Sequence, residues 1–205
     1  MTGMRTFAAL LLLTTAPHAY AQDRPLPFDK GWDLQGDRTV VIEAGGRHVL
    51  QVETGFGHRR DVKIEDGTID FDVLVTKRRS FVYVYFRVVG DGEREEFYLR
   101  PHKSGLPDAV QYAPVWQNKS GWQLHHGPGG TAAVPFEPAV WTHVRGVMQG
   151  RHAALFVKDM TTPVLMVPRL GARSTGGAPR AGRLPSGGCA GRGGDRKILE
   201  RRRPH

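Results

Sequence analysis

The sequence of 205 residues contains a single cysteine, Cys189. One cysteine excludes an intrachain disulfide framework and a multi-cysteine zinc site. Long apolar runs are also missing, because the one near the N-terminus has about 12 residues, too few to cross hydrocarbon about 30 Å thick. No segment keeps a 3.6-residue apolar period, which argues against a helical bundle. A hydrophobic content of 40% nevertheless excludes wholesale disorder, so at least part of the chain folds.

The net charge of +9 is concentrated at the C-terminal end. Residues 171–205 hold eight arginines and one lysine against two acids, whereas residues 22–170 hold 19 bases and 18 acids. A nucleic-acid-binding domain carries its basic residues on the folded surface. The nearly neutral central region therefore argues against nucleic acid as the partner of the folded part.

The N-terminus is typical of a secretory signal peptide. Arg5 supplies a positive start, residues 7–13 form a short apolar stretch, and Ala19-Tyr20-Ala21 is a cleavage pattern. We expect residues 1–21 to be removed before Gln22, and the protein to be exported to the periplasm or the extracellular space. The short apolar stretch predicts no membrane span.

Residues 22–170 show the patterns of β-strands. Ile69, Phe71 and Val73 alternate with polar residues, as in a half-buried strand. Phe81–Val89 is apolar on both faces and is expected to lie centrally between layers. Gly45-Gly46 predicts a hairpin turn. Other strands are expected at Thr39–Glu43, His48–Glu53, Glu95–Leu99, Ala109–Val115, Gly121–His125, Trp141–Met148, Ala153–Lys158 and Val164–Val167. Many short strands separated by turns predict an all-β antiparallel sandwich or barrel.

The last 35 residues differ in composition from the rest. Residues 171–205 contain nine glycines and eight arginines, and the last aromatic residue of the chain is Phe156. Such a segment buries too little apolar surface to offset its ordering entropy, so a disordered basic tail is expected. One interpretation is a natural tail that binds anionic polymers or lipid headgroups. The other, which we favour, is out-of-frame translation of GC-rich DNA.

Four segments carry a recognisable order of motifs: Asp66–Val73, Phe81–Arg87, Phe136–Arg145 and Ala153–Lys158. In that order they resemble the concanavalin A-like lectin/glucanase superfamily, two-sheet jelly rolls of the laminin-G type. The resemblance covers roughly half of the chain and implies a jelly-roll β-sandwich over residues 22–170. It also implies carbohydrate as the ligand, since the superfamily includes lectins, laminarinase-type glycoside hydrolases and a related group of 3-keto-disaccharide hydrolases.

The sequence departs from that pattern at two places. Laminarinase-type enzymes carry paired acids that begin with Glu on one strand, but Thr68 stands at that position, followed by Asp70 and Asp72. The two aspartates can face one side together, but no Glu nucleophile is present for retaining hydrolysis. The related sandwiches also close with a strand beyond the position of Leu170, and residues 171–205 show no strand pattern. A sheet edge is therefore expected to be exposed.

The densest polar cluster alternates along one predicted strand. Glu96, Tyr98, Arg100 and His102 share a face because strand side chains have a period of two, while Phe97 points the other way. Aromatic faces beside fixed polar groups are what pyranose rings require. A carbohydrate-binding site on a concave sheet face is therefore predicted, and its residues are Glu96, Tyr98, Arg100, His102, Asp108, Tyr112 and Trp122. A second interpretation treats the same aromatics as core residues and the charges as a solvated face.

The sequence contains no catalytic signature and leaves enzymatic activity open. If the protein is a glycoside hydrolase of the 3-keto-disaccharide or a related type, Glu96, His102 or Asp108 would be the acid or base. A structural or degenerate domain without a ligand is a further alternative. Metal is not expected, because the adjacent His125 and His126 would point to opposite faces of a strand. Neither a cofactor nor an oligomeric state is indicated.

Overall fold

The structure is a computed structural model that describes residues 26–28, 30–59, 61–90, 92–171, 188–192 and 197–200, the last two ranges through their backbone alone. The predicted signal peptide lies outside the described residues. Among the described residues, no helix has the length and apolar character needed to cross a membrane.

The regular secondary structure of the described chain is almost entirely β-strand. Its strands are β1 (Trp32–Ala44), β2 (Arg47–Arg59), β3 (Gly67–Leu74), β4 (Phe81–Val89), β5 (Glu93–Leu99), β6 (Val110–Trp116), β7 (Lys119–Ser120), β8 (Thr131–Ala132), β9 (Trp141–Gln149), β10 (His152–Val157), β11 (Leu165–Val167), β12 (Gly188–Arg192) and β13 (Lys197–Glu200). Two short 3-10 helices interrupt them, η1 (Pro101–Lys103) and η2 (Trp122–Leu124). The predicted all-β class is confirmed. The strand predicted at Gly121–His125 is wrong, because the hydrogen bonds from Leu124 N to Gly121 O and from His125 N to Trp122 O close 3-10 turns there.

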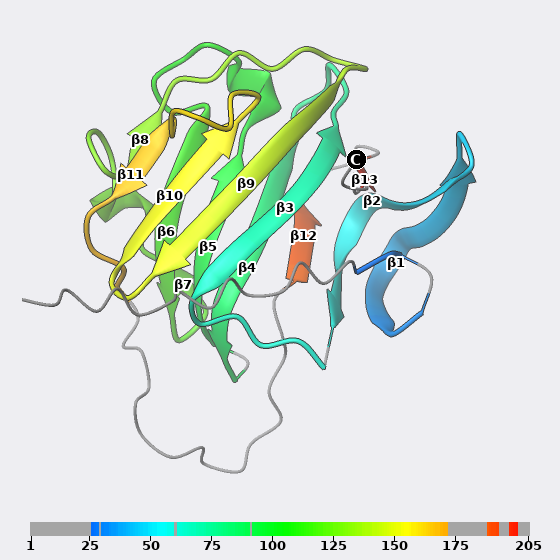
Figure 1. Cartoon of the computed structure of the whole chain (residues 1–205), viewed down its shortest axis with the longest axis horizontal. Helices are drawn as coiled ribbons and strands as arrows, with labels where there is room; N and C mark the ends of the chain where they lie inside the picture. Colours follow the sequence, from blue (N-terminus) through cyan, green and yellow to red (C-terminus); the bar gives the residue numbers. More distant parts are fainter. Residues whose placement is uncertain are drawn as a thin grey trace, which may run out of the picture.

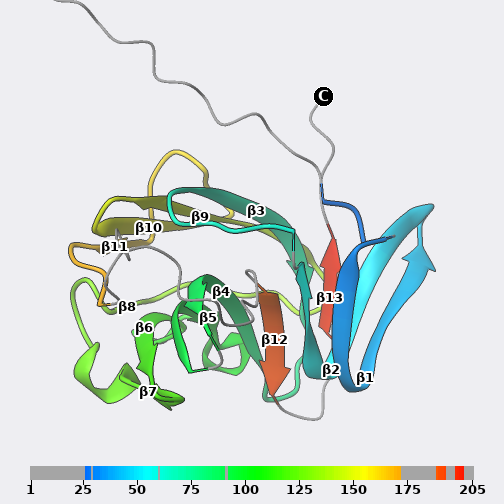
Figure 2. The ribbon, with the colours of Figure 1, turned by 90° about the horizontal axis from the view of Figure 1, so that it is seen from below.

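All strand pairs are antiparallel, and the strands fold into two facing layers. One layer follows the order β11-β10-β9-β3 and the other the order β4-β5-β6-β7, with β8 also paired to β6. Figure 1 shows β9 and β10 in front of β5 and β6, and Figure 2 shows the two layers edge-on, with the β1–β2 hairpin at one side. This arrangement is the β-sandwich that the strand pattern predicts.

The core lies between the two layers because strand side chains alternate. Val82, Val84 and Phe86 of β4 are buried, whereas the residues between them are only partly buried. On the opposite layer, Val144 and Met148 of β9 are buried in the same alternating way. β4 lies centrally within its sheet, since it pairs with β5 on one side and with β12 on the other. The expectation that it lies between layers is wrong, because Phe81, Tyr83 and Tyr85 on its second face are only partly buried.

The β1–β2 hairpin follows its predicted turn. Ala44 pairs with Arg47, which leaves Gly45 and Gly46 as a two-residue turn. Both glycines have positive φ, 60° and 73°, the conformation that tight hairpin turns require and that residues with a Cβ rarely adopt. Each strand of the hairpin is 13 residues long, so the hairpin extends well beyond the segments predicted from alternation.

Two strands from the C-terminal segment join the hairpin to both layers. β12 lies between β2 and β4, with Cys189 opposite Gly57 and Val84. β13 lies between β2 and β3, with Leu199 opposite Leu50 and Val73. We call this connection the seam. It differs from the expectation of no strand beyond Leu170. The rest of the predicted disordered tail, residues 172–187, 193–196 and 201–205, lies outside the described residues.

Arg87 connects three segments at one end of the sandwich. Its Nε donates to the carbonyl of Glu65 at 2.7 Å, and its Nη2 donates to Asp66 Oδ1 at 2.7 Å and to the carbonyl of Gly150. Asp66 in turn accepts the backbone N–H of Gly150. The φ of Arg87 is +49°, at an irregularity in the pairing of β4 with β5. The β2–β3 loop, β4 and the β9–β10 turn are therefore held together by one guanidinium.

Candidate functional site

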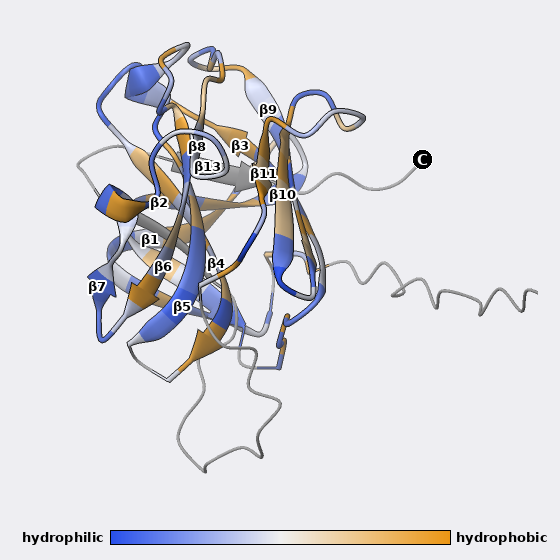
Figure 3. Ribbon diagram, turned by 90° about the vertical axis from the view of Figure 1, so that its left-hand side faces the viewer, coloured by the Kyte–Doolittle hydropathy of each residue, from blue (hydrophilic) through white to orange (hydrophobic). Residues whose placement is uncertain are grey.

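Glu96, Tyr98 and Arg100 project from the side of the β4–β5–β6 layer that points away from the core, which we call the outer face. Tyr98 pairs with Tyr83 of β4 and with Gln111 of β6, so these three side chains share that face. The intervening Phe97 belongs to the core. The predicted period-two arrangement is therefore present. Figure 3 shows β5 largely in the hydrophilic colour, as its charged start, Glu93 to Glu96, requires.

Gln111 lies at the centre of the outer face and is fully buried. Its Oε1 accepts hydrogen bonds from the Tyr98 hydroxyl at 2.6 Å and from Arg100 Nη2 at 2.8 Å. Its Nε2 donates to the carbonyls of Trp122 and His125, both at 2.7 Å. One amide therefore orients a phenol and a guanidinium and also fixes the η2 segment beside them. The sequence prediction did not include Gln111 among the site residues.

An aromatic row runs along the outer face and consists of Phe81, Tyr83 and Tyr85 of β4 with Tyr98 of β5. The ring centroids of Phe81 and Tyr83 are 6.1 Å apart, those of Tyr83 and Tyr85 are 5.9 Å apart, and those of Tyr83 and Tyr98 are 5.3 Å apart. Tyr98 is buried, whereas the three β4 rings are only partly buried. The row therefore offers accessible ring surface above a buried phenol.

Arginines accompany this row. The guanidinium carbons lie 5.8 Å from the Phe81 ring for Arg79, 4.4 Å from the Tyr85 ring for Arg94, and 5.3 Å from the Tyr98 ring for Arg100. Cations at such distances are attracted by the electron-rich face of an aromatic ring, by about 0.5–2 kcal/mol. The arrangement fixes the ring positions without closing the outer face.

The carboxylates of the cluster are held by neighbouring groups. Glu96 accepts a hydrogen bond from the Ser120 hydroxyl at 2.9 Å and lies 3.4 Å from Arg94 Nε. Asp108 Oδ2 lies 2.7 Å from Lys103 Nζ and 3.2 Å from Arg100 Nη2. Burial raises the pKa of Asp108, but the hydrogen bond from Lys103 and the two positive charges outweigh it, so its pKa is lowered. Asp108 is therefore ionised at neutral pH.

His102 follows β5 in η1 and packs on the row. Its ring lies 5.0 Å from that of Phe81, edge to face, and its Nδ1 lies 2.9 Å from the carbonyl of Ser80. Burial lowers the pKa of His102, and the charges of Arg79, Arg100 and Lys103 lower it further, against the Ser80 hydrogen bond. The imidazole is therefore neutral at pH 7.

Of the two remaining predicted site residues, Tyr112 lies elsewhere and Trp122 lies beside Gln111. Tyr112 is fully buried on the inner side of β6, where its hydroxyl donates to Glu95 Oε2 at 2.5 Å and its ring packs on Phe97. The expectation that it shares a face with Tyr98 is wrong, because Tyr112 pairs with Phe97, one residue out of phase. Trp122 is 46% exposed, and η2 positions it next to Gln111 through its backbone carbonyl.

Asp70 and Asp72 share a face as predicted, but on the opposite layer. His143 Nδ1 lies 2.7 Å from Asp72 Oδ1, and its Nε2 lies 3.1 Å from Asp70 Oδ1. Arg145 Nε lies 2.9 Å from the same Asp70 oxygen. This arrangement joins β3 to β9 across the sheet and lies on the far side of the core from the aromatic row. Nowhere in the described residues do three or more His, Cys, Asp or Glu side chains form a group that could hold a metal ion.

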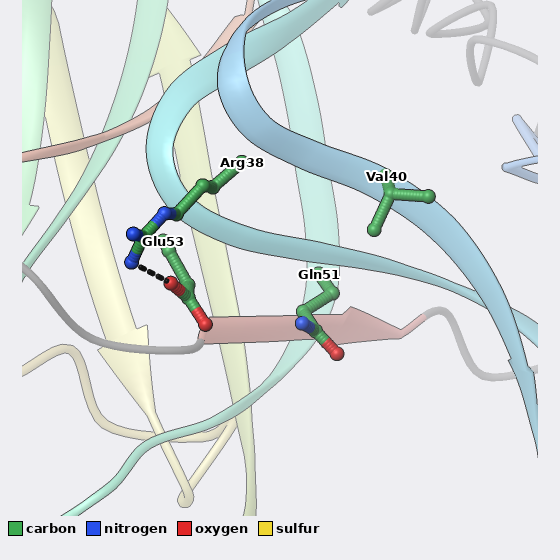
Figure 4. Close-up of a pocket in the computed structure, with 4 residues that line it drawn as sticks. All are labelled: Arg38, Val40, Gln51 and Glu53. Atoms are coloured by element: carbon green, nitrogen blue, oxygen red, sulfur yellow. Dashed lines mark hydrogen bonds and ion pairs between the residues drawn. The ribbon is translucent and has the colours of Figure 1, made fainter.

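Two shallow hollows lie on the β1–β2 hairpin rather than at the outer face. One, of about 350 Å³, is lined by Arg38, Val40, Gln51 and Glu53, and Figure 4 shows the Arg38–Glu53 ion pair at its side. The other, of about 410 Å³, is lined by Gly31, Trp32, Asp33, Arg59 and Asp61. Neither includes a predicted site residue. Both hollows are open to solvent and enclose no volume in which a small molecule could be buried, so we do not regard them as binding sites.

Acidification is expected to destabilise the fold through His102 and His125. Burial lowers the pKa of His125 as well, so the unfolded chain takes up protons at a higher pH than the folded chain does. Their contribution to stability is therefore present above pH 6.5 and decreases as the pH falls below it. Urea unfolding at pH 7.5 and pH 5.5 measures the change. His102→Gln and His125→Gln should each reduce this dependence, and the double variant should reduce it most.

The fold has relatives among solved structures. A carbohydrate-binding module, CBM66, from Bacillus subtilis superposes with a TM-score of 0.55 at 11% identity, over 83% of this chain and 92% of that one. A protein of unknown function with a galectin-like fold, also from Bacillus subtilis, gives a TM-score of 0.54 at 10% identity, over 82% and 86%. No family model matches the sequence, and neither does any curated protein. At these identities the likeness establishes the fold, a galectin-like jelly-roll β-sandwich.

Proposed function

We propose that this protein binds carbohydrate on the outer face of the β4–β5–β6 layer. The observation that carries the proposal is the partly exposed row of Phe81, Tyr83 and Tyr85 beside the buried Tyr98–Gln111 hydrogen bond. Sugar C–H groups stack on aromatic faces, and their hydroxyls bind to fixed polar groups. The fold likeness to a carbohydrate-binding module supports the same conclusion.

The predicted site residues on the outer face differ in exposure, and therefore in whether they can contact a ligand or only position other groups. Glu96, Tyr98 and Arg100 are almost fully buried, so they form a floor that positions other groups. The surfaces left for a ligand belong to the β4 rings and His102. Tyr98 and Arg100 are therefore positioning residues, and their loss should lower thermal stability together with binding.

Replacing Tyr83 with alanine tests the proposal. Tyr83 lies in the middle of the aromatic row, and stacking aromatics at binding hot spots contribute about 2 kcal/mol or more, so binding to the best ligand of a glycan array should weaken about thirtyfold. Trp141→Ala is the matched control, because Trp141 is a partly exposed aromatic residue of the opposite layer. Melting curves of both variants report folding. Unchanged binding by a folded Tyr83→Ala protein would refute the site.

The finer assignments are also proposals. Membership of the concanavalin A-like superfamily rests on the four motif segments, and export rests on residues 1–21. Sequencing the N-terminus of protein recovered from outside the cytoplasm tests export, with Gln22 as the expected first residue. A hydrolase receives less support, because Glu96 is buried against Ser120 and Arg94 while Lys103 and Arg100 keep Asp108 ionised. Neither carboxylate is arranged to donate a proton to a leaving group.

A further inference from the structure

Positive charge gathers at one end of the aromatic row. Lys77, Arg78 and Arg79 are exposed and lead directly into β4. Lys103 follows His102 in η1, and the contact between Ser80 and His102 brings the two segments together. The Phe81 ring lies between the Arg79 guanidinium, at 5.8 Å, and the His102 ring, at 5.0 Å. The row therefore ends in a basic cluster.

This basic cluster is only partly neutralised. Asp108 is shared between Arg100 and Lys103, so one carboxylate serves two cations. Neither Lys77 nor Arg79 forms an ion pair with any other residue that the structure describes. Burial lowers the pKa of His102, and the charges of Arg79, Arg100 and Lys103 around its ring lower it further. Such an environment favours an anionic group beside an aromatic surface.

We infer that the ligand of the outer face is an acidic glycan, whose carboxylate or sulfate group binds at the Arg79–Lys103 end while a sugar ring stacks on Phe81 and Tyr83. This inference rests on the proposed function and specifies its ligand class. A nucleic acid would also supply anions and rings. It is disfavoured because residues 22–170 are nearly neutral, with 19 bases and 18 acids.

The test measures binding of the full chain to four probes of similar length by titration calorimetry. The probes are a uronic acid oligosaccharide, a sulfated oligosaccharide, a neutral oligosaccharide and single-stranded DNA. An acidic sugar should bind at least tenfold more tightly than the neutral one, and raising NaCl from 50 to 300 mM should remove most of that difference. The two acidic probes separate carboxylate from sulfate recognition.

A double substitution in the basic cluster tests whether the acidic group of the glycan binds there. Lys77→Gln with Arg79→Gln should weaken binding of the acidic sugar at least tenfold more than binding of the neutral sugar, which Arg79 affects only through its contact with the Phe81 ring. Arg151→Gln is the control, since Arg151 is an exposed arginine next to Gly150, which contacts Arg87 near the other end of β4. Equal affinity for acidic and neutral sugars would overturn the inference but keep the proposed function. DNA binding that Arg79 controls would overturn the inference in favour of a nucleic acid, and binding of no sugar would overturn both.

Discussion

A chain that ends at Gly171 is expected to lose its cooperative unfolding transition and to aggregate. Without β12 and β13, the β1–β2 hairpin has no strand partner in either layer, and β2, β3 and β4 each present an unpaired edge. Unpaired edges of long strands are templates for association between chains. Thermal unfolding followed by circular dichroism, together with size-exclusion chromatography, measures both effects.

A matched truncation separates loss of the seam from shortening of the chain. A chain that ends at Glu200 keeps both strands and should melt as the full chain does. Ile198→Pro should reproduce part of the damage, because β13 is paired on both sides and proline removes a ladder hydrogen bond from a central strand. An undiminished melting temperature in the chain ending at Gly171 would show that the seam contributes nothing to the fold.

Arg87→Ala is expected to lower the free energy of unfolding by about 2–4 kcal/mol. The Arg87 side chain is only 5% exposed, and the substitution removes its hydrogen bonds to the carbonyls of Glu65 and Gly150. Hydrogen bonds to a charged group contribute about 1.5–3 kcal/mol each, and water replaces part of that at these exposed residues. The lost ion pair with Asp66 contributes less to the destabilisation, because the Asp66 side chain is 57% exposed and water can solvate it. Urea unfolding provides the measurement.

Arg38→Ala supplies the comparison for this effect. Arg38 also forms an arginine–carboxylate pair, with Glu53 at 2.8 Å, but its side chain is 67% exposed. Exposed pairs contribute about 0–1 kcal/mol, so this variant should unfold almost as the parent does. Arg87→Lys should be intermediate, because lysine keeps the charge but cannot reach three acceptors in one plane. Similar losses for Arg87→Ala and Arg38→Ala would contradict the role assigned to Arg87.

The strands were predictable from alternation where one face is buried. The alternation around Phe71 determines which side of β3 faces the core. The two apolar faces of Phe81–Val89 do not, and the structure buries only the face with Val82, Val84 and Phe86 in the core. The resemblance to known sandwiches indicated the right kind of architecture, although the fold relatives share only 10–11% identity with this chain. A sandwich tolerates such divergence because its strands require only a pattern of burial.

The site was less predictable because neither the sequence of β5 nor that of β6 determines the register in which the two strands pair. Gln111 lies opposite Tyr98, and Tyr112 lies opposite Phe97. A shift of one residue would exchange Gln111 and Tyr112 between the faces. The loop between the two strands is long enough to permit either register, so only the packing of Tyr112 against Glu95 and Phe97 decides it. The role of Gln111 therefore depends on tertiary structure.

The C-terminal strands had little sequence signal. Glycine is a poor strand former and stands at Gly188 and Gly191 of β12, while β13 is short and has one β-branched residue, Ile198, between charged ends. Their pairing depends on the open edges of β2, β3 and β4, which exist only once the rest of the sandwich has formed. Tertiary context therefore overrides propensity at the seam.

The seam also determines when the protein can finish folding during its synthesis. β2 ends at Arg59, whereas the strands that flank it begin only at Gly188 and Lys197. Pairings between segments far apart in the sequence are slow to form, because the intervening chain must close into a loop first. The edges of β2, β3 and β4 therefore stay open to chaperones until β12 and β13 have been synthesised and have paired with them.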